Sequence, residues 1–171
     1  RVDRERMGID VGGGAGGILA AERYRKEMLR KGWRRARPSL LLPFATCAIT
    51  DSIAQKYGIL GPRATIATAC SSSATAIGYA LSSIRQGEVE VAIAGGSESL
   101  SEVTFGGFNA LRSLDEDRCR PFDLNRKGLS LGEGAAFLVI EEAEHAVRRG
   151  AKVYAEILGY GLTGDGHHMT A

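Results

Sequence analysis

Short, nearly unbroken apolar segments alternate with helix-forming segments, and this pattern constrains the fold more than any other feature of the sequence. We expect strands at 7–11, 64–69, 89–94, 135–140 and 153–160, and helices at 18–31, 45–57, 74–85 and 141–149. Strands that read as continuous apolar runs are typical of parallel sheets covered by helices on both faces. The pattern therefore predicts an α/β fold of this kind. Residues 100–114 and 115–131 are expected to be irregular, the second as a long polar loop.

Cys70 lies where the apolar run 64–69 meets the helix-forming segment 74–85. A strand that leads directly into a helix places the residue at the bend beside the unpaired amides of the first helical turn. The partial positive charge there favours the thiolate, which is the nucleophilic form of cysteine. Cys70 is therefore a candidate nucleophile, and a buried structural cysteine is the alternative. The helix after it contains mostly small and apolar residues, so we expect it to be buried on most sides.

Gly12, Gly14 and Gly17 match the GxGxxG spacing of dinucleotide-binding loops, between a predicted strand and a predicted helix. That fingerprint also requires a second strand ending in an acidic residue about 20 positions later. The corresponding region is Arg34-Arg35-Ala36-Arg37-Pro38, which is basic and unlike a strand. We interpret the glycines as a tight turn with close backbone packing and keep a nicotinamide-dependent oxidoreductase as the less favoured alternative.

Positive charge is concentrated near the start of the chain, although the net charge is only +2. Residues 1–37 contain eleven Lys and Arg against five Asp and Glu, and the remainder contains eleven against fifteen. The excess gathers at Arg23, Arg25, Lys26, Arg30, Lys31, Arg34, Arg35 and Arg37. A solvated face is one interpretation and a docking surface for an acidic partner is the other. Nucleic acid is not favoured as a partner, because aromatic residues do not interleave with the basic ones.

Composition indicates a globular protein, with 44% apolar and 25% charged residues. No apolar run approaches the roughly 18 to 20 residues of a membrane-spanning helix, and the first residues do not resemble a signal peptide, so we expect a cytoplasmic location without membrane association. Three widely spaced cysteines without a CxxC pair suggest neither a disulfide framework nor a zinc site. His167 and His168 alone do not complete a set of metal ligands, so no metal is expected, with metal binding by this pair as the alternative to a solvated loop.

Seven motifs carry a family resemblance, and they cover essentially the whole chain. They are Gly61-Pro62; Thr68-Ala69-Cys70-Ser71-Ser72; Ala94-Gly95-Gly96-Ser97-Glu98; Arg120-Pro121-Phe122-Asp123; Gly132-Glu133-Gly134-Ala135-Ala136; Glu141-Glu142-x-Glu144-His145-Ala146-x-x-Arg149-Gly150-Ala151; and Asp165-x-x-His168-Met169-Thr170. In this order and spacing they resemble the beta-ketoacyl-acyl-carrier-protein synthases of the condensing-enzyme family, closest to the type II elongating synthases.

The resemblance implies a thiolase-like layered α/β fold, with helices on both faces of mixed sheets. Residues 1–171 would form most of the N-terminal half, and the C-terminal half would be absent. Two catalytic histidines, a nearby lysine and a second oxyanion-hole donor would belong to that half. His168 matches a family histidine near the pocket that is not one of the catalytic pair. One departure is Lys127-Gly128-Leu129, where the family commonly has Asp-Gly-Phe, and it leaves the preferred chain length open.

The resemblance also implies the chemistry. Cys70 would accept an acyl group from phosphopantetheine on an acyl carrier protein, and condensation with malonyl-carrier protein would give a 3-oxoacyl product. No metal or redox cofactor would be needed. Arg35, Arg37 and Arg112 fall near positions where family members meet their carrier. A homodimer is expected for the intact protein.

Two alternatives to fatty-acid elongation stay open at this point. One is a type II polyketide ketosynthase, which would use the same chemistry on other acyl groups. The other is a piece without condensing activity, which would act as an interaction module for the carrier protein.

Overall fold

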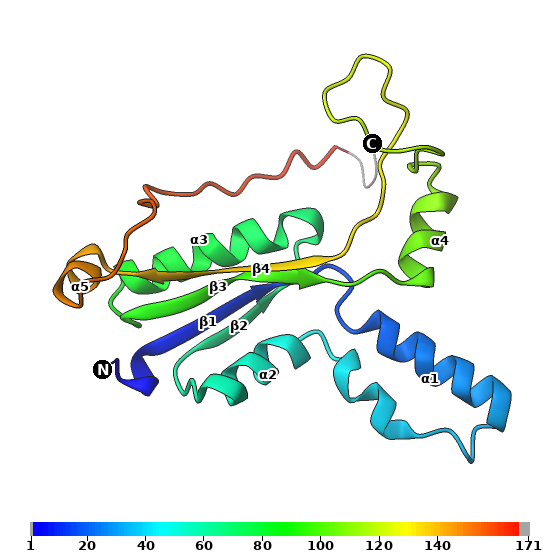
Figure 1. Ribbon diagram of the computed structural model, residues 1–171, viewed down its shortest axis with the longest axis horizontal. Coiled ribbons are helices and arrows are strands. Elements are labelled where there is room, and N and C mark those ends of the chain that lie inside the picture. Colours follow the sequence, from blue (N-terminus) through cyan, green and yellow to red (C-terminus); the bar gives the residue numbers. More distant parts are fainter. Residues whose placement is uncertain (1, 168–171) are drawn as a thin grey trace.

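The computed structural model describes residues 2–167, which form a mixed α/β fold (Figure 1). The strands are β1 (Met7–Gly12), β2 (Arg63–Ile66), β3 (Val91–Glu98) and β4 (Gly134–Glu141). The α-helices are α1 (Ile18–Lys31), α2 (Ala48–Tyr57), α3 (Ser72–Arg85), α4 (Glu102–Ala110) and α5 (Ala143–Arg148). Short 3-10 turns are η1 (Arg4–Arg6), η2 (Pro38–Phe44) and η3 (Ala69–Ser71).

The four strands form one sheet in the order β2-β1-β3-β4. β1 runs parallel to both neighbours, so that Ile9 pairs with Arg63 on one side and with Ile93 on the other. β4 is antiparallel to β3, with Ile93 opposite Val139. The predicted α/β class is confirmed. The expectation of a parallel sheet is wrong at β4, whose direction makes the sheet mixed, as in the thiolase-like fold.

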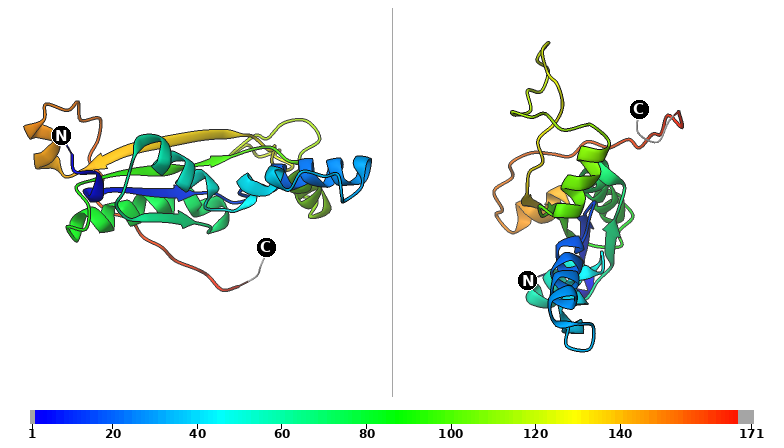
Figure 2. Two further views of the ribbon diagram at one scale, coloured as in Figure 1. Left: turned by 90° about the horizontal axis from the view of Figure 1, so that it is seen from below. Right: turned by 90° about the vertical axis from the view of Figure 1, so that its right-hand side faces the viewer.

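Helices cover both faces of the sheet, as predicted (Figures 1 and 2). Side chains alternate along a strand, so the two faces carry different residues. On one face Ala80 of α3 packs with Ala92 and Ala94 of β3. On the other face Ala54 of α2 packs with Ile9 and Val11 of β1. The central strands β1 and β3 are therefore buried from both sides.

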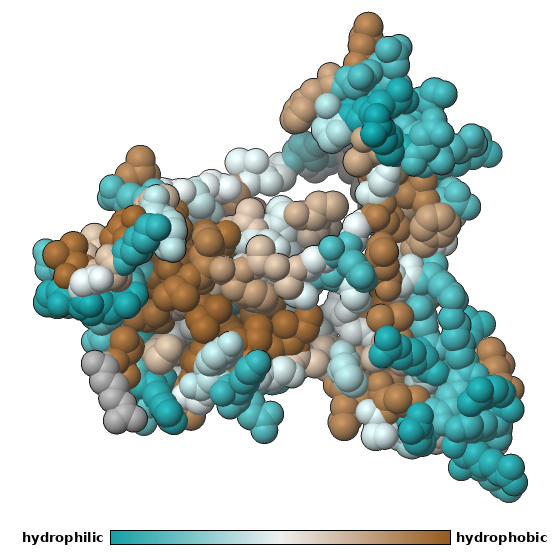
Figure 3. Space-filling model, viewed as in Figure 1, coloured by the Kyte–Doolittle hydropathy of each residue, from teal (hydrophilic) through white to brown (hydrophobic). Residues whose placement is uncertain are grey.

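The edge strand β4 leaves much of its apolar surface uncovered in the described residues. Leu138 is 50% exposed and Val139 is 64% exposed, although both are in a strand. Apolar side chains gather over this part of the molecule in Figure 3. Tyr79 of α3 is 52% exposed as well. The expectation that this helix is buried on most sides holds apart from this open side, since its buried residues are Ser72, Ala76, Gly78, Ala80, Leu81 and Ser83.

Two segments differ from their predicted conformation. The expected strand at 153–160 is absent, and Tyr160 lies instead against Gly78 of α3, while Arg85 donates a hydrogen bond to the carbonyl of Leu158 (2.7 Å). A helix surface offers no ladder of backbone partners, so this segment stays extended but unpaired. The region expected to be irregular contains α4, which begins because Ser101 caps it by accepting from the Thr104 amide (3.0 Å).

Candidate functional site

Cys70 occupies the bend between a strand and a helix, as the sequence predicts. β2 ends at Ile66, η3 contains the cysteine, and α3 follows without a break at Ser72. The thiol is exposed, so the alternative of a buried packing cysteine is wrong. An exposed sulfur at the start of a 14-residue helix lies near the positive end of the helix dipole.

A strained residue immediately before the cysteine makes the chain turn sharply. Ala69 has φ +52°, a left-handed conformation that costs an L-residue about 1–3 kcal/mol. Hydrogen bonds on both sides hold it there: the Thr68 amide donates to Ser72 Oγ (2.9 Å), and Ser72 Oγ donates to the Ala69 carbonyl (2.6 Å). Ser71 Oγ also donates to the Thr68 carbonyl (2.7 Å). The hydroxyl groups around Cys70 therefore fix the bend that presents the thiol.

The backbone amide of Cys70 is available to a ligand. In the turn, the first amides that donate are those of Ser71, to the Thr68 carbonyl (3.3 Å), and Ser72, to the Ala69 carbonyl. The Cys70 amide precedes them and makes no hydrogen bond within residues 2–167. An unpaired amide beside a nucleophile can stabilise the oxyanion that forms when the nucleophile attacks a carbonyl group.

Glycines bring the ends of β1 and β3 into contact with the start of α3. A Cβ on Gly12 would lie 2.3 Å from the Ser72 carbonyl carbon and the Ser73 nitrogen. A Cβ on Gly96 would lie 1.9 Å from Ser73 Oγ. Real side chains never approach so closely, so only glycine allows this packing. The strand ends therefore set the position of the helix that carries Cys70.

The glycine-rich turn after β1 holds a carboxylate of this chain rather than presenting its amides to solvent. The amides of Gly14 and Ala15 donate to Oε2 of Glu98, at 2.7 and 3.0 Å. A Cβ on Gly17 would lie 1.7 Å from the carbonyl oxygen of Pro43. The interpretation as a tight turn with close packing is confirmed. The nicotinamide alternative is wrong, because an internal carboxylate occupies the amides that would face a pyrophosphate.

A cavity of about 360 Å³ lies behind this turn. Its apolar walls come from α1, η2 and the start of α2, and include Leu19, Ala20, Leu40, Pro43 and Ile49. The turn itself contributes Gly16 and Gly17, the end of β3 contributes Ser97 and Glu98, and Ser99 follows them. Its size and apolar lining suit a small ligand or part of a larger one.

The three predicted carrier-binding arginines are not brought together. The loop after α1 and the segment after α4 lie at opposite ends of one side of the molecule in Figures 1 and 2. Arg35 and Arg112 are exposed. Nε of Arg37 pairs with buried Glu27 (3.2 Å), which also binds Lys31 (2.7 Å). The hydrogen bond from Lys31, followed by that from Arg37, lowers the pKa of the Glu27 carboxyl. Arg37 therefore has an internal partner, and the binding role of all three stays a prediction.

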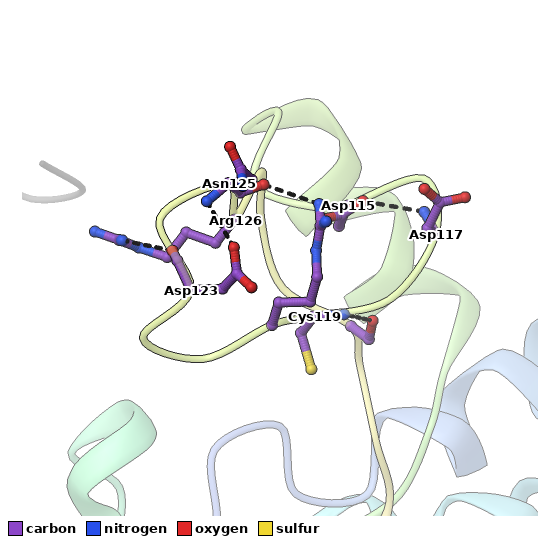
Figure 4. A network of polar contacts seen from close by, with 8 residues as sticks. Asp115, Asp117, Cys119, Asp123, Asn125 and Arg126 are labelled. Atoms are coloured by element: carbon purple, nitrogen blue, oxygen red, sulfur yellow. Dashed lines mark hydrogen bonds and ion pairs between the residues drawn. The ribbon is translucent and has the colours of Figure 1, made fainter.

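The polar loop at 115–131 is held by its own side chains (Figure 4). Asp115 accepts from the Asp117 amide (3.0 Å), and this bond is the main reason why its pKa is lowered. Arg120 lies 3.7 Å from Asp115 and donates to the carbonyl of Asn125 (2.9 Å). Gly128 packs tightly at the base, where a Cβ would lie 2.6 Å from the Asp115 nitrogen. The Lys127-Gly128-Leu129 departure thus keeps the glycine that this loop requires.

The remaining predictions concern metals, membranes and the end of the chain. His168 lies outside the described residues. Within 2–167 the structure contains no group of three or more His, Cys, Asp or Glu side chains arranged to hold a metal ion. No described helix is both long enough and apolar enough to cross a bilayer.

Sequence reasoning missed two residues whose side chains the structure shows to be held inside the fold. Glu98 belongs to a recognised motif, but nothing in the sequence showed that its side chain reaches the glycine turn. Asp10 interrupts an otherwise apolar strand and is only 5% exposed, and burial raises its pKa to about 6. A charged residue within a buried strand is the signal that could have identified it.

A mixed α/β sheet with an exposed cysteine at the start of its covering helix is the arrangement expected of a protein of the thiolase-like class. The family model "Beta-ketoacyl synthase, N-terminal domain" matches residues 1–146. The chain belongs to the beta-ketoacyl synthase family.

Relatives and solved structures agree with this assignment. The chain is 38% identical to the mitochondrial 3-oxoacyl-[acyl-carrier-protein] synthase of Arabidopsis thaliana, over 98% of this chain and 38% of the relative. It is also 38% identical to 3-oxoacyl-[acyl-carrier-protein] synthase 2 of Staphylococcus aureus, over 98% of this chain and 43% of the relative. The chain therefore spans about two fifths of the length of these relatives.

The fold matches solved ketosynthases closely. A beta-ketoacyl synthase from Burkholderia phymatum is 35% identical with a TM-score of 0.87, over 99% of this chain and 43% of that one. The ishigamide ketosynthase/chain length factor is 34% identical with a TM-score of 0.93, over 98% of this chain and 42% of that one. A type II polyketide ketosynthase, solved with its acyl carrier protein, is 28% identical with a TM-score of 0.92, over 98% of this chain and 44% of that one.

Proposed function

We propose that the protein to which this chain belongs is a beta-ketoacyl-acyl-carrier-protein synthase that works through an acyl-Cys70 intermediate. The observation that carries the proposal is the exposed thiol of Cys70 beside its own unpaired amide at the start of α3. The Cys70 thiolate attacks the thioester carbonyl of the acyl-carrier substrate, and the amide donates to the oxyanion. The carbon–sulfur bond to phosphopantetheine then breaks, and the released thiolate takes up a proton.

The second half-reaction extends the chain by two carbons. Malonyl-carrier protein loses carbon dioxide, and the carbanion that remains attacks the carbonyl of acyl-Cys70. The Cys70 thiolate leaves, and a 3-oxoacyl-carrier product forms. The family resemblance implies that the histidines and the lysine of this step belong to the part of the family's length that this chain does not span. Phosphopantetheine arrives with the substrate, and no further cofactor enters the proposal.

The cavity behind the glycine turn is the place that we propose for the acyl chain. The turn connects it to the nucleophile, because Gly12 contacts the start of α3 while Gly16 and Gly17 line the cavity. Its apolar walls suit an alkyl chain, and its serine hydroxyls tolerate a partly oxidised one. Fatty-acid elongation is the first candidate, since the relatives are named 3-oxoacyl-acyl-carrier-protein synthases. A type II polyketide ketosynthase is the second, since one of the similar structures is titled as a type II polyketide acyl-carrier protein with its ketosynthase.

Acyl carrier protein is the partner that we propose for the basic surface. One similar ketosynthase was solved in complex with its own acyl carrier protein, which is a finding about that protein. In this chain Arg34 and Arg35 are exposed beside Trp33, which is 70% exposed with Arg34 over its ring at 5.2 Å. An exposed aromatic residue among exposed cations fits an acidic partner with an apolar patch.

We also propose a homodimer, because β2 forms an edge of the described sheet. An edge strand offers unpaired backbone groups to a second strand, and the strand before Cys70 resembles the one that pairs across the two-fold axis in family homodimers. A solution mass of one subunit for the full-length protein at micromolar concentration would contradict the dimer.

Differential labelling tests the catalytic proposal against an inert carrier-binding module. Cys47, Cys70 and Cys119 are all exposed, so their rates with iodoacetamide compare reactivity rather than access. We expect Cys70 to react fastest in the full-length protein, and acyl-thioester to block it by forming an acyl-enzyme detectable by mass spectrometry. Equal rates at the three thiols, or no acylation of Cys70, would favour the inert module.

A further inference from the structure

Glu98 ends β3, and its carboxylate reaches the turn that follows β1. Oε2 accepts hydrogen bonds from the amides of Gly14 (2.7 Å) and Ala15 (3.0 Å). Oε1 is buried and has no hydrogen-bond partner in the described part of the chain. We propose that Glu98 is a positioning residue that holds the glycine turn in one conformation and so fixes the wall of the acyl cavity. This inference rests on the proposed function.

The turn needs these two hydrogen bonds, which we call the Glu98 tie, because its own sequence gives it little rigidity. Five of residues 12–17 are glycine, and Ala15 is the exception. Glycine samples more backbone conformations than any other residue, so a glycine-rich segment without external contacts is mobile. Hydrogen bonds to an ionised carboxylate are shorter and stronger than those between neutral groups. One carboxylate oxygen that accepts from two adjacent amides therefore restricts the middle of the turn, which has no side chain larger than the methyl group of Ala15.

The contacts of the turn show why its position matters for the site. At one end Gly12 touches Ser72 and Ser73, the residues that directly follow the Cys70 turn. At the other end Gly16 and Gly17 line the cavity together with Glu98 itself. The Glu98 carboxylate thus holds a turn that contacts α3 at one end and lines the cavity at the other. Loss of these hydrogen bonds would leave the contacts of Gly12 with α3 and of Gly17 with Pro43 in place, and would free the middle of the turn beside the cavity wall.

The first measurement uses the full-length protein and needs no substrate. We compare Glu98→Ala with Glu98→Gln, and use Glu90→Ala, directly before the other end of β3 and paired with exposed Arg6, as the matched control. In Glu98→Ala, hydrogen exchange at the Gly14 and Ala15 amides should rise at least about tenfold, because their acceptor is lost. Glutamine keeps an oxygen acceptor, so Glu98→Gln should restore most of the protection. Unchanged hydrogen exchange at the Gly14 and Ala15 amides in Glu98→Ala would contradict the proposal that Glu98 holds the turn.

The second measurement asks whether the tie sets acyl selectivity. We determine Cys70 acylation kinetics over a series of acyl chain lengths, with the unfolding temperature of each variant recorded. The proposal expects Glu98→Ala to flatten the preference between chain lengths at least about fivefold, mainly through KM, with Glu98→Gln close to wild type. A uniform loss at every length would show a merely structural role and overturn the positioning role. Wild-type protein that takes no acyl group on Cys70 would instead refute the proposed function, while the exchange result would still decide the tie.

Discussion

Gly12 at the end of β1 lies directly against Ser72 at the start of α3, so closely that a Cβ on the glycine would lie 2.3 Å from the serine carbonyl carbon. This contact is between two backbones, and neither can move aside as a flexible side chain could. The position of Cys70 is therefore set by a strand that is nearly 60 residues away in the sequence.

Gly12→Ala should destabilise the protein and displace the Cys70 turn. Overpacking a tight core contact costs about 1–3 kcal/mol, and the same displacement should lower the iodoacetamide rate of Cys70. Gly106→Ala is the control, because a Cβ on this α4 residue would meet nothing within 4 Å, and alanine is the better helix former. Chemical denaturation and thiol labelling of the full-length variants check both effects. A Gly12→Ala protein as stable and as reactive as wild type would contradict the close contact.

Asp10→Asn should stabilise the protein at pH 8 and have little effect near pH 4. Burial raises the pKa of Asp10 from 3.8 to about 6, so the folded state binds its proton more tightly than the unfolded state. The contribution of Asp10 to the free energy of unfolding is fully present below pH 3.8, falls as the pH rises through 6, and stays reduced above it. The difference between the two pKa values corresponds to about 3 kcal/mol of unfolding free energy at pH 8, part of which Asp10→Asn should recover.

Urea denaturation at pH 4 and pH 8 measures this dependence, and Asp51→Asn serves as the control. Asp51 is an exposed carboxylate 3.3 Å from Arg63, and its replacement should change stability little at either pH. An Asp10→Asn gain that is equal at the two pH values would show that ionisation is not its cause.

Reversing Arg35, Arg37 and Arg112 to Glu should weaken binding of acyl carrier protein at low salt, by about tenfold or more. Charge pairs between exposed groups act mainly at low ionic strength, so the difference should shrink as salt is added. Among single Ala variants, Arg35→Ala and Arg112→Ala should have the larger effect on affinity. Arg37→Ala should affect it less, because the Arg37 guanidinium already pairs with Glu27.

Titration of the carrier protein by calorimetry at two salt concentrations tests this surface. Cys70 acylation from a small acyl-thioester, which needs no carrier contact, should stay unchanged in all these variants. Unchanged carrier affinity of the triple variant at low salt would contradict the proposal that these three arginines bind the carrier protein.

Arg149→Ala should destabilise the protein at neutral pH far more than Arg148→Ala. The side chain of Glu141 is 9% exposed and accepts from Arg149 Nε (2.8 Å) and pairs with His145 Nδ1 (2.6 Å). The hydrogen bond from Arg149 is the main reason why the pKa of Glu141 lies below 4.5. This stability is present above pH 4.5 and is lost as pH falls through the folded-state pKa.

Arg148 is the matched control, because it only pairs with exposed Glu144 at 3.8 Å, and such pairs contribute little. Denaturation of both variants between pH 3.5 and pH 7 should show a difference at neutral pH that shrinks in acid. Equal losses for the two arginines at pH 7 would contradict the role of the Glu141 network.

The sequence by itself determined the α/β class, the approximate positions of the four strands of the sheet, and the place of Cys70 at a strand-to-helix bend. These features depend on local pattern: continuous apolar runs form β1 and β3, and hydroxyl residues favour the turn before α3. The motifs around Cys70 and Glu98 also carried the family resemblance, which the match to residues 1–146 confirms.

Tertiary structure alone decided the antiparallel direction of β4, the unpaired course of residues 153–160 along α3, and the internal pairing of Arg37 with Glu27. It also decided that Glu98 meets the amides of Gly14 and Ala15. The reason is that strand direction, ion pairing and capping of a turn depend on which groups are neighbours in space. Spacing along the chain fixes a local conformation, but only packing shows which distant carboxylate or helix lies beside it.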